Sequence, residues 1–306
     1  MFYRNKFLWI ALAVFIGIYG FWAYQEMQAS KKFVSSEFQK KFTLVEDPID
    51  VIIPCTRKDL ATLDLCIEGI RKNGQNVRRV IILSPEKYTD KAEWFPEDRF
   101  PFNKKDIALA LFADPERAEN YLSLKKNRAG WLLQQLLKLY ATQVIPNLSS
   151  NILLLDADTI FLSPVQFINE KGGSIFHPSL REYHLPYFKH GRRMLPGFHR
   201  LHPEYSGVAH HMLMQKSVLE NLMQEVEDLH KKPFWQVFCA LVDQKDIYHA
   251  GASEYEIYFN YALARTDQVS IETLKWINTA DIDSLDQYRR EGYHYISSHD
   301  YLREEM

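Results

Sequence analysis

The sequence predicts an α/β fold in which helices flank a mixed, mostly parallel sheet, preceded by one N-terminal transmembrane helix. The first sign is the order strand, helix, strand between residues 50 and 84, which implies a parallel pair with a right-handed crossover. The second is the apolar run from Ile152 to Leu155, which is typical of a buried strand. With 306 residues and 46% apolar composition, the chain can bury a large core.

The N-terminal region predicts a membrane anchor. Residues 7–24 contain no charged side chain, and at about 1.5 Å per residue they are long enough to cross a hydrocarbon core of about 30 Å. We interpret residues 1–6 as a short tail, 7–24 as an uncleaved anchor, 25–47 as a lysine-rich stem and 48–306 as the globular domain. A cleaved signal peptide is the alternative, but the apolar run exceeds the usual length of its hydrophobic region. Lysines and arginines on both sides leave the orientation open.

Apolar periodicity and turn residues predict the elements of the domain. Leucines at helical spacing mark the helix after Gly130, and prolines among charges indicate a loop-rich connection after Ser84. In order, we expect a strand at 50–54, a helix at 60–73, a strand at 77–84, a connection with short helical pieces at 86–120, a helix at 130–143, strands at 152–155 and 172–176, a long loop at 177–204, a strand or bend at 205–214, and helices at 217–230, 234–242 and 254–264.

Composition argues against a nucleic-acid-binding protein and against a protein held together by disulfides or zinc fingers. The formal charge of −2 and a pI near 6.6 give no general attraction to nucleic acid, which usually requires a basic face. The three cysteines form no CxxC pair and no zinc-finger spacing. We therefore expect buried free thiols and no disulfide framework.

The most informative motif follows the strand at 152–155. Asp156 and Asp158 come at its carboxyl end, where open α/β sheets bind ligands. Alternate residues of an extended chain point the same way, so both carboxylates can converge on one hard divalent cation, which could neutralise a diphosphate. The alternative is a turn in which aspartates bond nearby backbone amides, although two acids after so apolar a run are less easily explained in this way.

This order of elements, with an apolar strand that ends in Asp156, Ala157 and Asp158, resembles the metal-dependent GT-A glycosyltransferases with their DxD motif. The resemblance spans roughly residues 48–301 and implies a GT-A fold. It implies an enzyme that moves a sugar from a nucleotide-diphosphate-sugar to an acceptor hydroxyl, with Mn²⁺ or Mg²⁺ at both aspartates. Members similar to glycogenin imply His299 as a third metal ligand. An exposed terminal histidine is the alternative.

The resemblance also implies residues that contact the donor or the reacting sugar. The candidates for donor binding are Thr56, Arg57, Asp59, Arg128, Gln135, Lys138, Asp156 and His211. Helix capping is the alternative for Thr56 and Asp59, and a solvated helix face for Lys138. Glu254 and Asp158 are the candidate catalytic residues, with Glu254 as a general base or as a group that stabilises the sugar. A favourable acid in the first turn of a helix is the alternative for Glu254.

The partners and the location follow from this resemblance. We expect a glycan, lipid or protein acceptor, a membrane reached through the N-terminal helix, and no nucleic acid. We expect a single-pass membrane protein. In a eukaryote it would be of type II in the Golgi or endoplasmic reticulum, and in a bacterium it would lie in the inner membrane with a cytoplasmic catalytic domain.

Two other classes of protein are alternatives to a glycosyltransferase. A haloacid dehalogenase-like Mg²⁺-dependent phosphatase also carries DxD after an apolar strand, but usually on its first strand. An inactive membrane-tethered binding protein predicts the loss of an acid, yet Asp156 and Asp158 are both present.

Overall fold

The computed structural model describes residues 18, 20, 21, 23–34, 40–180 and 182–303. The predicted tail at 1–6 and most of the predicted transmembrane segment at 7–24 lie outside these residues. Within the described part of the chain, no helix combines the length and apolar character needed to cross a membrane. The predicted limits of anchor, stem and domain stay predictions.

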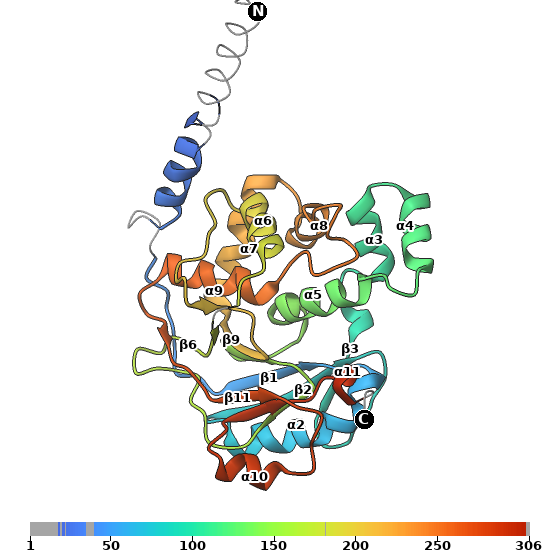
Figure 1. The fold of residues 1–306 in the computed structure, drawn as a ribbon, viewed down its shortest axis with the longest axis vertical. Helices are drawn as coiled ribbons and strands as arrows, with labels where there is room; N and C mark the ends of the chain where they lie inside the picture. Colours follow the sequence, from blue (N-terminus) through green and yellow to red (C-terminus); the bar gives the residue numbers. More distant parts are fainter. Residues whose placement is uncertain (1–17, 19, 22, 35–39, 181, 304–306) are drawn as a thin grey trace, which may run out of the picture.

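A five-stranded sheet in the order β3-β2-β1-β4-β9 forms the centre of the molecule (Figure 1). Its strands are β1 (Ile49–Pro54), β2 (Val77–Ser84), β3 (Glu93–Pro96), β4 (Asn151–Leu155) and β9 (His211–Gln215). Strand β1 pairs in parallel with β2 and β4, β3 extends the parallel part, and β9 runs antiparallel to β4. The predicted mixed, mostly parallel sheet with flanking helices is confirmed.

Helices cover both faces of this sheet (Figure 1). One face carries α2 (Leu60–Asn73), and the other carries α5 (Ala129–Val144), α7 (Lys216–His230), α8 (Phe234–Ala240) and α9 (Glu254–Arg265). Alternate residues of a strand point to opposite faces. Ile52 accordingly packs in the larger core beneath α5, whereas Val51 and Ile53 pack in the core beneath α2.

Two predicted loop regions contain more regular structure than expected. The connection at 86–120 holds β3 as well as the helices α3 (Lys104–Phe112) and α4 (Pro115–Ser123), and the predicted loop at 177–204 contains α6 (Leu185–Met194). Asn103 caps α3 and forms a capping box with Asp106. Helix α6 is short, and its few buried side chains lie among His, Lys and Arg residues. Its sequence therefore shows no apolar periodicity from which a helix could be predicted.

Short strands in the second half of the chain complete the fold. They are β5 (Thr159–Phe161), β6 (Ile175–Phe176), β7 (Ser179–Leu180), β8 (Tyr205–Ser206), β10 (Ser270–Ile271), β11 (Trp276–Asn278) and β12 (Tyr295–Ser297), with the helices α10 (Leu285–Arg290) and α11 (Asp300–Arg303). Strand β12 pairs antiparallel with β5, so Ser297 lies opposite Thr159. This pairing brings the C-terminal segment beside the DxD turn.

The N-terminal helix ends against the domain. Residues 23–33 are helical, and Phe33 at their end is buried with its ring centroid 5.6 Å from that of Phe198. Further on, the Lys40 amide donates to the Arg265 carbonyl over 2.6 Å. The described part of the predicted stem therefore contacts the domain through Phe33 and again through Lys40.

Candidate active site

The DxD turn lies between β4 and β5, and its backbone is fixed by three neighbouring elements. The Asp156 amide donates to the His210 carbonyl over 3.0 Å, and the Ser298 amide donates to the Asp158 carbonyl over 2.8 Å. The Thr62 hydroxyl donates to the carbonyl of the residue between the two aspartates over 3.0 Å. With the backbone held in this way, both carboxylates are available for contacts of their own.

Asp158 meets the C-terminal histidine. Its Oδ2 lies 2.7 Å from His299 Nδ1, and its Oδ1 accepts a hydrogen bond from the Ser297 hydroxyl over 3.2 Å. Burial opposes ionisation, but the hydrogen bond and charge of His299 outweigh it and lower the pKa of Asp158 to about 2. Burial also disfavours the charged imidazole, yet the same hydrogen bond raises the pKa of His299. The pair is therefore a carboxylate facing an imidazole that readily holds a proton.

Asp156 meets a buried lysine. Lys138 Nζ donates to Asp156 Oδ1 over 2.7 Å, to Glu254 Oε1 over 2.9 Å and to the Tyr255 hydroxyl over 3.0 Å. Burial disfavours the ammonium, but the carboxylates of Asp156 and Glu254 outweigh it and hold the pKa of Lys138 well above its usual value. The ammonium thus joins α5 and α9 to the DxD turn.

The start of α9 presents Glu254 to this lysine. The Ser253 side chain accepts from the Glu256 amide over 3.2 Å and so forms the N-cap of α9. The Glu254 amide donates to Gln135 Oε1 over 3.0 Å, while Gln135 Nε2 is buried with no partner among the described residues. Glu254 is therefore both a first-turn acid and a buried partner of Lys138.

These side chains line a pocket of about 250 Å³. Its lining contains seven of the predicted site residues, namely Asp59, Gln135, Lys138, Asp156, Asp158, Glu254 and His299. The other residues that line it are Lys58, Trp131, Gln134, Ala157, Tyr187, Val208, Ala209, Ser253 and Tyr255. We refer to it as the DxD pocket.

A second pocket of about 330 Å³ adjoins the first, since both are lined by Lys58, Asp59, Trp131 and Gln134. We refer to it as the β1 pocket, because it lies at the carboxyl end of β1. Thr56 and Arg128 line it, as do apolar groups from Pro54, Leu83 and Leu137. The Arg128 guanidinium lies over the ring of Trp131, 4.6 Å from its centroid.

The predicted helix caps at the end of β1 are not formed. Neither Thr56 nor Asp59 makes a side-chain cap hydrogen bond, and the Thr56 hydroxyl instead donates to Asp59 Oδ2 over 3.1 Å. Burial raises the pKa of Asp59. Both side chains are thus placed to line the β1 pocket.

Two predicted site residues lie away from both pockets. The exposed Arg57 donates to Glu86 over 2.7 Å. His211 is buried, with Nε2 3.2 Å from His177 Nδ1 and its ring against Phe161. Its neighbour His210 precedes β9 and approaches the site instead, with its ring centroid 5.2 Å from that of His299.

Other lining residues had no signal in the sequence. Tyr255 bonds Lys138, and Tyr187 reaches the DxD pocket from α6, a helix that the sequence did not predict. Trp131 of α5 lines both pockets. Identifying these residues requires the relative placement of α5, α6 and α9.

The predicted metal ligands converge only in part. In the described chain, no three His, Cys, Asp or Glu side chains are grouped as a bound metal ion requires. Asp158 and His299 meet, whereas Asp156 bonds Lys138 and has a side chain that is 24% exposed. Carboxylate and imidazole donors suit Mn²⁺. The 2.7 Å between the donor atoms of Asp158 and His299 is close to the spacing of about 3 Å between neighbouring ligands of an octahedral ion with bonds of about 2.1 Å.

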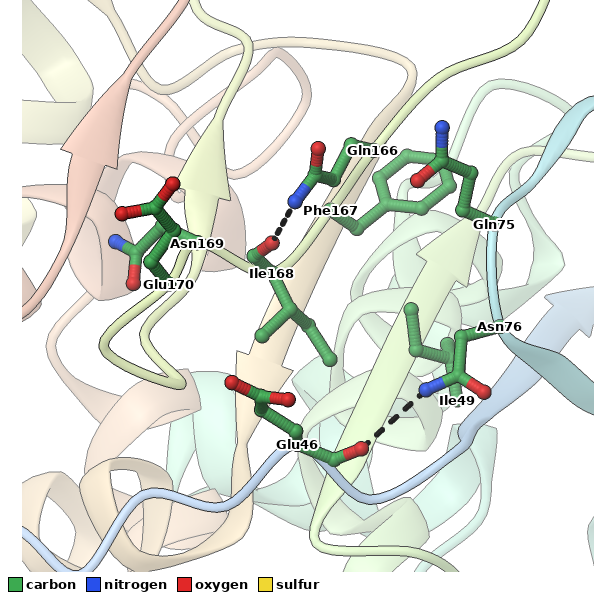
Figure 2. Close-up of a pocket in the computed structure, with 9 residues that line it drawn as sticks. All are labelled: Glu46, Ile49, Gln75, Asn76, Gln166, Phe167, Ile168, Asn169 and Glu170. Carbon is green, nitrogen blue, oxygen red and sulfur yellow. Dashed lines mark hydrogen bonds between the residues drawn. The ribbon is translucent and has the colours of Figure 1, made fainter.

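A third pocket, of about 310 Å³, lies at the opposite edge of the sheet, by the start of β1 and the turn before β2 (Figure 2). Gln166 Nε2 donates there to the Ile168 carbonyl over 2.6 Å, and Asn76 Nδ2 donates to the Glu46 carbonyl over 3.3 Å. Its lining includes none of the predicted site residues. Parallel sheets bind ligands at the carboxyl ends of their strands, which favours the DxD and β1 pockets.

The chain belongs to DUF6492, a family of unknown function whose model matches residues 46–289. The sequence matches no curated protein. Among solved structures, mouse xyloside xylosyltransferase 1 in its apo form is 13% identical, with 84% of this chain and 99% of that chain covered and a TM-score of 0.40. The mannosyltransferase Ktr4p of S. cerevisiae is 14% identical, with 56% of this chain and 50% of that chain covered and a TM-score of 0.34. Similarity at this level carries no functional argument, so function must be argued from the site.

Proposed function

We propose that this protein is a membrane-anchored glycosyltransferase of GT-A type that transfers a sugar from a nucleotide-diphosphate-sugar to an acceptor hydroxyl. One observation carries the proposal. Two aspartates and a buried lysine line a pocket at the carboxyl edge of the parallel sheet, and a second, partly apolar pocket adjoins it. A donor of this kind has a strongly anionic diphosphate beside a flat, less polar nucleoside, and the two pockets match these halves.

The β1 pocket suits the nucleoside. Its volume of about 330 Å³ lies in the range of about 300–1,000 Å³ that is usual for ligand sites. The Trp131 ring gives an aromatic surface for a base, and Thr56 and Asp59 supply a hydroxyl and a carboxylate for ribose hydroxyls. Because Trp131 lines both pockets, one molecule can extend from the β1 pocket into the DxD pocket.

The DxD pocket suits the diphosphate and the sugar. Asp158 and His299, with Asp156, form a donor set for Mn²⁺ or Mg²⁺. When bound, such an ion stabilises negative charge on a departing nucleoside diphosphate. Lys138 supplies a fixed positive charge beside Asp156, and it is already desolvated, so little reorganisation is needed as charge develops.

The reacting sugar lies next to Glu254 in this proposal. Glu254 lines the DxD pocket and keeps its carboxylate 2.9 Å from the ammonium of Lys138. Gln135 Nε2, buried and without a partner among the described residues, is available to donate to a sugar hydroxyl. The acceptor is a glycan, a lipid or a protein, and the predicted anchor at 7–24 keeps the enzyme on a membrane.

The test uses the full-length chain, purified in detergent and supplied with Mn²⁺ and a panel of nucleotide-diphosphate-sugars. We expect release of nucleoside diphosphate from at least one donor, because water can replace an unknown acceptor. Asp156→Asn and Asp158→Asn should each lower that rate by about 100-fold or more, as expected when a group that stabilises the transition state is lost.

The chain offers a matched control, since Asp281 and Asp283 form a second Asp-x-Asp in a turn outside both pockets. The double variant D281N/D283N should keep the wild-type rate. As a readout independent of activity, Mn²⁺ should raise the melting temperature of the wild type but not that of His299→Ala. If no donor is turned over and D158N behaves like the wild type in both assays, the proposal fails.

A further inference from the structure

Helix α6 borders the DxD pocket and carries an exposed surface that no part of the described chain covers. Three apolar side chains near its start are exposed: Leu180 by 57%, Tyr183 by 55% and Leu185 by 42%. Lys189, Arg192 and Arg193 follow along the same helix and are also exposed. We refer to these six residues as the α6 surface.

The spacing puts the cations on one side of the helix. Leu185, Lys189, Arg192 and Arg193 are separated by four, three and one positions, so they lie along one stripe. Met194, on the opposite side, is buried in the core. Helix α6 is thus amphipathic in an unusual sense, because its outward side combines apolar and basic groups.

Two of the three cations are not neutralised by the described protein. Arg193 pairs with Asp243 over 2.7 Å. Lys189 and Arg192 make no ion pair among the described residues, and Arg192 bonds only the Phe188 carbonyl of its own helix, over 3.3 Å. A ligand for this surface must therefore offer negative charge as well as apolar contact.

The N-terminal helix leaves the domain beside α6. Phe33 packs on Phe198, and the Phe198 ring lies 6.2 Å from that of Phe188 in α6. Beyond Phe33 toward the N-terminus, the described apolar side chains Ile18 and Phe21 are exposed by 64% and 66% and belong to the uncharged run at 7–24. Figure 1 shows α6 and this helix at one end of the molecule, with α2 and α10 at the other.

We infer that the α6 surface binds an anionic phospholipid membrane. Apolar side chains next to Lys and Arg are what an interfacial helix presents to lipid, and the cations are attracted to acidic headgroups. The N-terminal helix packs beside α6 through Phe33, so a membrane that holds the predicted anchor would lie at the same end of the domain as the α6 surface. Tyr187, on the other side of α6, lines the DxD pocket, so this contact places that pocket about one helix diameter, roughly 10 Å, from the lipid headgroups.

One consequence concerns the acceptor and rests on the proposed function. A pocket this close to the headgroups takes an acceptor that is itself carried by the membrane. The lipid contact does not depend on this consequence and can be measured without any sugar donor.

The test places a reporter on the α6 surface of the full-length chain. The three native cysteines are buried, so a cysteine introduced by Leu185→Cys can be labelled selectively with a polarity-sensitive fluorophore. The labelled protein is reconstituted with vesicles of phosphatidylcholine, or of phosphatidylcholine with one third phosphatidylglycerol. We expect a blue shift and brighter emission with the anionic vesicles, and a smaller change with the neutral ones.

Two controls define the result. Charge reversal by K189E/R192E should abolish the response to anionic lipid, whereas R71E/K72E, on the exposed end of α2, should leave it intact. A label at Asp286→Cys in α10, at the opposite end of the molecule, should not respond. Equal emission in both lipids, no association with either, or a response that survives K189E/R192E would each overturn the inference. Because no sugar donor is present, this failure would leave the proposed transferase activity untouched.

Discussion

Replacing Lys138 by methionine should destabilise the protein more than any surface charge change. Methionine keeps much of the side-chain volume but leaves Glu254, which is buried, without its cation. Removing one partner of a buried ion pair typically costs about 3–5 kcal/mol. At about 2–4 °C for each kcal/mol in a large domain, we expect the melting temperature to fall by roughly 10 °C.

The matched control is Lys91→Met, because Lys91 also contacts two carboxylates, Asp64 over 2.9 Å and Glu68 over 2.6 Å, but on the surface. Its variant should melt close to the wild type, since exposed ion pairs contribute little. The assay is thermal unfolding of the full-length chain in detergent, with urea midpoints as a second measure.

A double variant separates charge from packing. Glu254→Gln removes the carboxylate that K138M leaves unpaired, so K138M/E254Q should recover part of the stability lost in K138M, a non-additivity expected of contacting residues. If K138M lowers the melting temperature no more than K91M, or if the two substitutions are strictly additive, the buried pair does not hold α5 to α9.

Three further predictions concern other parts of the chain. Asp50 is fully buried and accepts from Arg78 over 2.9 and 2.6 Å, so Asp50→Asn should lower the free energy of unfolding by about 2 kcal/mol in urea titrations, and an unchanged midpoint would contradict this. The lowered pKa of Asp158 gives stability that is lost as pH falls toward about 2, and the raised pKa of His299 gives stability that is lost as pH rises through it. In EDTA, the stability difference between wild type and His299→Gln should therefore be largest between about pH 4 and about pH 6.5, and a difference that does not vary with pH would count against the pair. The three native cysteines are buried, so a thiol reagent should modify them only after unfolding, and rapid labelling of the folded chain would show that this packing is wrong.

The strand, helix, strand opening could be predicted because its signal is local. Apolar runs in β1 and β2 and helical spacing in α2 each determine their element without help from the rest of the chain. Helix α6 and strand β12 were not predicted. β12 is a three-residue strand that forms only because β5 and β11 lie on either side of it.

The site could be predicted where a motif is local and not where it depends on distant packing. Asp156 and Asp158 follow an apolar strand, which marks them in the sequence. The contact of Asp158 with His299 spans 141 positions and was expected only from a family resemblance. The bond from Lys138 to Glu254 depends on how α5 and α9 face each other, which periodicity cannot specify.

The position of the predicted donor-binding residue His211 also depends on how distant segments pack. Strand β9 begins at His211, which pairs with Leu155 of β4 and is buried, whereas His210 lies just before the strand. The sequence favoured His211, whereas the structure brings His210 toward His299, with ring centroids 5.2 Å apart.

The central claim, that the DxD pocket and the β1 pocket together bind a nucleotide-diphosphate-sugar, is tested most directly by calorimetric titration of the full-length chain with nucleoside diphosphates in the presence and absence of Mn²⁺. Our account predicts that one nucleoside diphosphate binds at a single site only with Mn²⁺, that Asp158→Asn abolishes this binding, and that D281N/D283N preserves it. Absence of binding by every nucleoside diphosphate, or equal binding by D158N and the wild type, would contradict the account.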